Sequence, residues 1–254
     1  MTEKIVKSIR EADMVLIGIG EELDSLRSIL TEPVYAELKS RTANDRMLPF
    51  VRKIILDKQE DNLYKNMVPI LENKNYFIIS TCQDGKIKKA GLNEERIVEP
   101  CGGYEKLQCS EGCTNNLYDI PSEFLFRVKD YMNGVCSEEG LEEPLCPVCG
   151  KPLVFNQVDA GNYIEDGYME KWMTYKKWLQ GTVNKKLCIL ELGVGMKYPT
   201  VIRWPFEKVA FFNQKSEFFR IHNKLYQMPE ELGGRGTGIQ QSPQKFLKEL
   251  SNYF

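Results

Sequence analysis

Short apolar runs alternate along the chain with stretches whose apolar residues recur every three or four positions. Continuous runs at residues 14–17, 76–80 and 187–192 predict buried strands, and shorter apolar segments at 96–99 and 218–221 predict two more. Helical spacing is found over residues 3–12, over 48–73, around 172–179 and after Ser242-Pro243. We also expect a helix to begin at Glu21.

Strands that alternate with helices at both ends of the chain predict an α/β protein. The expected architecture is a Rossmann-like parallel sheet with helices on both faces. Residues 1–100 and 158–254 would form this domain, with a helical insert over about 21–75. Residues 101–157 would form a small inserted module.

Charge and apolar content exclude two classes of partner. The 34 Lys and Arg residues nearly balance the 36 Asp and Glu residues, and no segment forms a basic stripe, so nucleic-acid binding is not expected. The longest apolar runs fall far short of the roughly 20 residues that a membrane span needs. The N-terminal residues lack the apolar stretch of a secretory signal, so we expect a cytoplasmic protein.

The cysteines supply the strongest chemical signal. Six of the eight lie within residues 101–149, and reduced cytosolic thiols in a chain of this size favour a metal site over disulfides. Cys109 and Cys113, followed by Cys146 and Cys149, form two pairs whose four thiolates could complete a tetrahedral zinc site. We therefore predict a structural zinc that holds the inserted module, with Gly150 at positive φ after the second pair. The alternative is four buried or free thiols. Cys101 and Cys136 are left over, and Cys136 is the weaker candidate for a substitute ligand.

The only histidine, His222, excludes two-histidine metal sites, and we expect it to be structural. Two glycine turns, at 18–20 and 193–195, follow predicted strands and could together line one ligand crevice. Glu21 and Glu22 disfavour phosphate at the first turn because carboxylates repel it. The polar segment that ends in Asp84 could contact a ligand or form a plain turn, and the glycine-rich segment 233–238 is expected to be a surface loop.

Placed in order, these segments resemble a sirtuin over nearly the whole chain. The similarity rests on the 18–20 turn, Asp84-Gly85, residues 97–102 before the cysteines, the 193–195 turn and a late strand that ends at Asn223. The segments 158–159, 163–166, 191–195 and 199–207 are similar in particular to the macrodomain-linked class M sirtuins, which act as protein ADP-ribosyltransferases.

This resemblance implies that NAD binds in an extended crevice. Gly18 and Gly20 would approach the pyrophosphate, and Asp84 would lie near the nicotinamide. The remaining cofactor-binding positions that the resemblance implies are Cys82, Gln83, Gly193, Val194, Gly195 and Asn223, with Asn223 at the adenine ribose.

Two positions depart from the family pattern. Cys82 stands where deacylating sirtuins carry an asparagine, and Cys101 stands where they carry a catalytic histidine and class M members a glutamine. Cys101 and Asp84 are therefore the candidate catalytic residues, but Cys101 could act as a base only with a lowered pKa. ADP-ribosyl transfer to a protein substrate depends less on a base at this position than deacylation does, because NAD supplies the electrophile and the protein chiefly orients the ribose. The alternatives are an inactive sirtuin fold that binds NAD, ADP-ribose or a protein partner, an NAD-dependent deacylase, and a scaffold without nucleotide.

Overall fold

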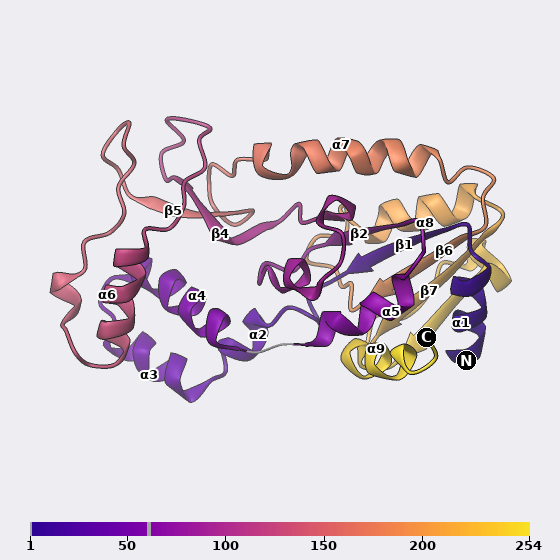
Figure 1. The fold of residues 1–254 in the computed structure, drawn as a ribbon, viewed down its shortest axis with the longest axis horizontal. Helices are drawn as coiled ribbons and strands as arrows, with labels where there is room; N and C mark the ends of the chain where they lie inside the picture. Colours follow the sequence, from indigo (N-terminus) through magenta and orange to yellow (C-terminus); the bar gives the residue numbers. More distant parts are fainter. Residues whose placement is uncertain (1, 60–61) are drawn as a thin grey trace.

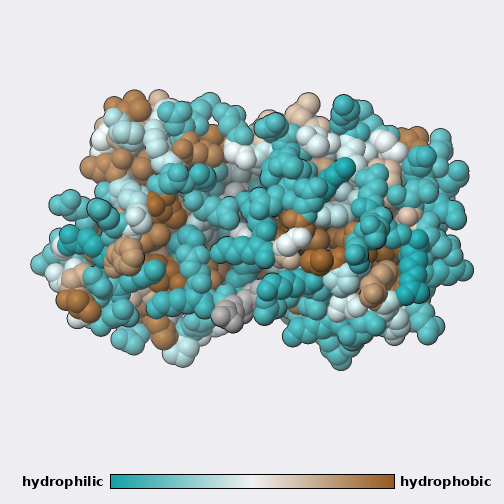
Figure 2. Space-filling view, viewed as in Figure 1, coloured by the Kyte–Doolittle hydropathy of each residue, from teal (hydrophilic) through white to brown (hydrophobic). Residues whose placement is uncertain are grey.

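The computed structural model describes residues 2–59 and 62–254, which form a larger and a smaller lobe (Figures 1 and 2). The two chain ends lie close together on the larger lobe (Figure 1). Its six-stranded sheet contains β1 (Met14–Ile19), β2 (Tyr76–Ser80), β3 (Ile97–Val98), β6 (Leu187–Leu192), β7 (Ser216–His222) and β8 (Gly236–Gln240).

All neighbouring strands of this sheet are parallel, in the order β3-β2-β1-β6-β7-β8. This is the Rossmann order, in which the first and fourth strands of the sheet lie side by side at its centre. The chain therefore leaves β1 and β6 in opposite directions. Gly18 pairs with Glu191 and Ile19 with Leu192, so the two glycine turns emerge together at this switch point.

Helices cover both faces of the sheet, as the alternation of elements predicts. One face packs against α1 (Thr2–Glu11), α5 (Met67–Leu71) and α9 (Pro243–Ser251), and the other against α7 (Asp166–Gln180) and α8 (Arg203–Phe212). In β1, Val15 and Ile17 belong to the first core, whereas Met14 and Leu16 belong to the second. The strand is apolar throughout because each of its faces is covered.

The smaller lobe is built around an antiparallel pair, β4 (Gly102–Cys109) and β5 (Leu153–Gln157). Its helices are α2 (Leu26–Ile29), α3 (Pro33–Arg41), α4 (Leu48–Lys58) and α6 (Ser122–Met132). Phe50 from α4 packs on Phe124 and Phe155, with ring centroids 4.9 and 4.8 Å apart. The early helices and the cysteine-rich segment therefore share one hydrophobic core.

Short 3-10 helices connect these elements. They are η1 (Asp45–Met47), η2 (Leu63–Asn66), η3 (Lys86–Ala90), η4 (Glu94–Arg96), η5 (Glu138–Gly140) and η6 (Glu230–Arg235). Among the residues that the structure describes, no helix combines the length and the apolar character that a membrane crossing requires.

The predicted strands and the parallel α/β class are confirmed, and two local predictions are wrong. No helix begins at Glu21. Residues 20–24 instead form a turn in which the Leu23 N–H donates to the Gly20 carbonyl, and α2 begins only at Leu26. Residues 236–238 of the segment 233–238, expected to be a surface loop, instead belong to strand β8 (Gly236–Gln240). Glycine permits this because a Cβ at Gly238 would lie 2.0 Å from the Tyr226 carbonyl oxygen. Of the predicted helical segment 48–73, residues 60–61 lie outside the described residues.

Candidate functional site

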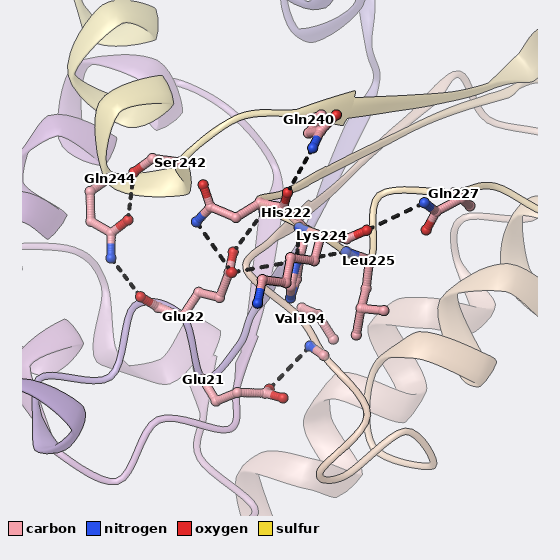
Figure 3. A network of polar contacts seen from close by, with 12 residues as sticks. Glu21, Glu22, Val194, His222, Lys224, Leu225, Gln227, Gln240, Ser242 and Gln244 are labelled. Carbon is pink, nitrogen blue, oxygen red and sulfur yellow. Dashed lines mark hydrogen bonds and ion pairs between the residues drawn. The ribbon is translucent and has the colours of Figure 1, made fainter.

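Four chain segments meet at the carboxyl edge of the sheet, where β1, β2, β6 and β7 end. Open α/β sheets place ligand sites at this edge. Figure 3 shows one part of it, with the turn after β1 facing the turns after β6 and β7.

The two glycine turns pack against each other. A Cβ on Gly20 would lie 2.3 Å from the Val194 Cα, and a Cβ on Gly18 would lie 2.4 Å from the Ile202 side chain. Both glycines therefore permit close packing within the chain. The Gly20 N–H donates to the Leu192 carbonyl rather than facing open space.

The Gly195 N–H is held by an acidic side chain. It donates to Glu21 Oε2 at 3.1 Å (Figure 3), and a Cβ on Gly195 would lie 2.1 Å from this carboxylate. Glu21 thus occupies a backbone donor that an anionic ligand could otherwise use.

Glu22 joins the turns after β1 and β7. Its carboxylate accepts the backbone N–H of Asn223 at 3.1 Å and the side-chain N–H of Asn223 at 3.2 Å (Figure 3). Its backbone carbonyl accepts a hydrogen bond from the Gln244 side chain. The position expected to bind ribose is therefore engaged by the chain's own carboxylate.

His222 is hydrogen-bonded within the chain, which fits the structural role expected of it. Its Nδ1 atom accepts the backbone N–H groups of Lys224 at 3.0 Å and Leu225 at 2.9 Å. A nitrogen that accepts these bonds carries no proton, and burial lowers the pKa of His222. Its 3.4 Å approach to Glu22 is therefore not an ion pair at neutral pH.

Two carboxylates, the half-buried Asp24 and the buried Asp84, clasp the turns after β1 and β2. Asp24 accepts the backbone N–H of Gln83 at 2.9 Å, and Asp84 accepts that of Ser25 at 2.8 Å. Burial, followed by the charge of Asp84, raises the pKa of Asp24 to about 6. Burial also raises the pKa of Asp84. Asp24 was missed at the sequence level because it carries no motif and only the fold brings it to Asp84.

The two unusual cysteines are both buried beside this clasp. The Cys82 thiol donates to the Gly20 carbonyl at 3.3 Å and accepts from the Tyr64 hydroxyl at 3.6 Å. Gln83 donates its side-chain N–H to the Cys101 carbonyl at 3.3 Å. Both cysteine residues are 1% exposed, and burial raises the pKa of Cys101 to about 12 and that of Cys82 well above its usual value. Both are therefore neutral thiols at neutral pH.

Arg203 is a second residue that the sequence did not single out as part of the site. It donates to the Val194 carbonyl at 2.9 Å and to the Leu225 carbonyl at 2.7 Å. It therefore fixes the glycine turn after β6 relative to the turn after β7. Its only sequence signal was its place in the similarity to class M sirtuins.

The four cysteines predicted to bind zinc lie together in the smaller lobe. All Sγ atoms of Cys109, Cys113, Cys146 and Cys149 lie within 4.8 Å of one another, and three of the separations are 3.5, 3.5 and 3.6 Å. Zinc–sulfur bonds of about 2.3 Å would place tetrahedral ligands about 3.8 Å apart, so the thiols fit one zinc ion. Gly150 has φ +68° as predicted. Cys136 is not part of the cluster and donates instead to the Arg127 carbonyl.

No protein-family model matches the sequence. The chain is 24% identical over 188 residues to a protein from Staphylococcus aureus named protein ADP-ribosyltransferase, with 73% of this chain covered. It is 32% identical over 157 residues, 58% of this chain, to a probable bifunctional ADP-ribose hydrolase/ADP-ribosyltransferase from Fusarium oxysporum. The chain spans 59% of the first protein and 26% of the second, less than two thirds of either.

Solved structures match nearly the whole chain. One, described as Sir2 bound to acetylated peptide, has a TM-score of 0.62 at 13% identity and covers 99% of this chain and 98% of its own. Another, a Sir2 homologue in complex with NAD, has a TM-score of 0.57 at 13% identity and covers 98% of this chain and 92% of its own. The chain has the sirtuin fold.

The sirtuin fold confirms the resemblance drawn from motif order, and the two relatives carry names that include ADP-ribosyltransferase. Within this fold, the four-cysteine cluster lies in the smaller lobe and the paired glycine turns lie at the switch point of the larger one. At Cys82 and Cys101, the two positions that depart from the sirtuin pattern, the structure has buried, neutral thiols.

Proposed function

We propose that the chain binds NAD at the carboxyl edge of its large sheet and transfers ADP-ribose to a side chain of a protein substrate. The sirtuin fold, with two glycine turns side by side at the switch point, is the observation that carries this proposal. The ADP-ribosyltransferase names of the relatives support the reaction type. Bound NAD would supply the electrophilic anomeric carbon, whose bond to nicotinamide breaks as the bond to the acceptor forms.

The Asp24–Asp84 clasp fits the charge of this reaction. Ionised carboxylates favour a nearby positive charge, and the ribosyl centre gains positive character as neutral nicotinamide leaves. Both carboxylates are held by backbone N–H groups, so they need no rearrangement when that charge develops. The resemblance places Asp84 near the nicotinamide of bound NAD. Asp24 is its partner in the clasp, because each carboxylate accepts a backbone N–H from the turn that carries the other.

A deacylase is disfavoured by Cys101. Deacylation in this fold requires a base that removes a ribose proton, and burial raises the pKa of Cys101 to about 12. The ionised fraction of a thiol falls roughly tenfold for each pH unit below its pKa, so less than about one Cys101 thiol in ten thousand would be ionised at pH 7. ADP-ribosyl transfer can instead rely on the acceptor and on orientation of the ribose.

A second candidate function follows from Glu21. Its carboxylate holds the Gly195 N–H, so a bound pyrophosphate could use this donor only after Glu21 moves away. Slow or absent turnover with retained nucleotide binding would make the chain a sensor or adaptor rather than a transferase.

The deciding experiment measures binding and nicotinamide release on the same purified full chain. Calorimetry with NAD and with ADP-ribose reports binding, and chromatography reports nicotinamide, with a cell lysate as a source of protein acceptors. Asp84→Asn tests the clasp, and Asp13→Asn, at the opposite end of β1, is the control with equal charge change. Release that depends on Asp84 supports the transferase, and binding without release supports the binder. Failure of both nucleotides to bind would refute both proposals.

A further inference from the structure

A cavity of about 120 Å³ lies between η3, the β3–β4 segment and the start of α7. Figure 1 shows α7 running along one side of the molecule, from beside β4 and β5 toward the far end of the large sheet. Glu21, Asp24, Asp84 and Cys101 do not line this cavity. It lies beside the edge at which we propose nucleotide binding, because Gln83 and Gly85, on either side of Asp84, do line it.

Glu99 lines the cavity and has one carboxylate oxygen without a hydrogen-bond partner among the described residues. Its side chain is only 8% exposed, and its Oε2 atom lies 2.9 Å from the Lys88 ammonium. Oε1 is buried and has no hydrogen-bond partner among the residues that the structure describes. A buried carboxylate oxygen without a donor costs free energy, so the geometry calls for a donor from outside the chain.

The ammonium beside Glu99 is shared with a second carboxylate. Lys88 is shared, because its ammonium also lies 2.6 Å from Glu105. One positive charge therefore faces two carboxylates. The other two lysines at the cavity are engaged elsewhere, Lys106 with Asp119 at 2.7 Å and Lys171 with the Glu94 carbonyl at 3.0 Å.

The remaining walls also suit a cation. Tyr163 and Tyr168 line the cavity with stacked rings whose centroids are 6.3 Å apart, and aromatic faces attract ammonium groups. Asn156 donates its amide hydrogens to Gln108 at 2.7 Å and to the Ile164 carbonyl at 3.0 Å. This leaves its side-chain oxygen as a further acceptor at the cavity.

We propose that this cavity binds a primary ammonium group, with Glu99 as its counter-ion and the two tyrosines as its walls. The group could come from a free alkylamine or from a lysine side chain of a protein. The proposal needs no bound nucleotide and is independent of the transferase proposal.

The pH dependence of binding provides an additional test. Burial raises the pKa of Glu99 to about 7, against the opposing effect of Lys88. The titratable groups that face it are Lys88 from η3, Glu105 from β4, Asp84 after β2 and Tyr163 before α7. Because the ionised carboxylate binds the cation, affinity should rise between pH 6 and pH 8.

The experiment uses the full chain without nucleotide and follows the backbone amides of Gly102, Gly103 and Gly167 by NMR, since these glycines line the cavity. The free probe is Nα-acetyl-lysine methylamide, and the protein-like probe is a short glycine- and serine-rich peptide with one lysine. The Nε-acetylated form of each probe serves as the neutral control. We expect saturable shifts at these glycines with the ammonium probes only, and a preference for the peptide would identify a protein source.

Glu99→Gln keeps the shape of the side chain and removes its charge, so ammonium affinity should fall about tenfold or more. Glu170→Gln makes the same charge change on exposed α7 surface and should leave the affinity unchanged. If Glu99→Gln fails to fold, Tyr168→Ala provides the second variant and should also weaken binding. Equal binding of the acetylated probes, equal binding by the folded Glu99→Gln variant, or no shift at the cavity glycines with either ammonium probe would overturn the proposal.

Discussion

Replacing Glu21 by alanine should strengthen the binding of phosphate-containing nucleotides. The Glu21 carboxylate accepts the Gly195 N–H at 3.1 Å, at the edge where we propose that NAD binds. If a pyrophosphate uses the same donor, the carboxylate must leave first. The variant removes this competition and exposes a free backbone N–H to the ligand.

The expected magnitude follows from comparing two costs. A carboxylate that stayed about 4 Å from a phosphate charge would repel it by about 4 kcal/mol at an effective dielectric constant of about 20. Breaking a hydrogen bond to a charged group costs about 1.5–3 kcal/mol, and the lower end applies here because the contact is only partly buried. The carboxylate should therefore swing away, and its removal should lower the Kd by about tenfold.

Calorimetry with ADP-ribose and with adenosine can test this reasoning. Glu21→Ala should bind ADP-ribose about tenfold more tightly and adenosine as before, because adenosine lacks phosphate. Glu21→Gln should give a smaller gain, since a neutral amide oxygen can still accept the Gly195 N–H. Glu11→Gln, with the same charge change at the end of α1 and at the opposite edge of the sheet, should give no gain. An unchanged ADP-ribose Kd for Glu21→Ala, or an equal gain for adenosine, would refute the competition.

Two further predictions concern the four-cysteine cluster and the Asp24–Asp84 clasp. Purified protein should contain one zinc per chain by mass spectrometry, and chelation or Cys109→Ser should lower the thermal midpoint of unfolding. The control Cys136→Ser should change neither the zinc content nor the midpoint. Metal-free protein of undiminished stability would contradict this prediction. Burial raises the pKa of Asp24 from 3.8 to about 6, so the folded chain holds this proton more tightly than the unfolded chain, and stability from this group falls as pH rises from 4 to 6. In urea unfolding, Asp24→Asn should therefore cost less free energy at pH 7 than at pH 4.5, and a cost independent of pH would show that Asp24 titrates normally.

Local patterns were sufficient where one strong signal set the structure. The apolar runs of β1, β2 and β6 predict strands because each is buried on both faces, and the Cys-x3-Cys and Cys-x2-Cys pairs predict a metal cluster because the spacing itself curls each pair around one point. Local patterns failed at residues 20–24 and 236–238. The first segment is held as a turn by long-range bonds to Gln83 and Asn223, and the second becomes a strand only because β7 offers an open edge.

The sequence by itself determined the parallel α/β class, the two glycine turns, the four-cysteine cluster and the order of motifs that resembles a sirtuin. These features depend on residues close together in the chain, or on the order of such segments. Only the tertiary structure decided that Asp24 meets Asp84, that Glu21 covers the Gly195 N–H, and that Glu99 is buried with one oxygen unpaired. The physical reason is that each of these depends on desolvation and on contacts between distant segments, and a carboxylate's neighbours and burial are set by packing rather than by its place in the sequence.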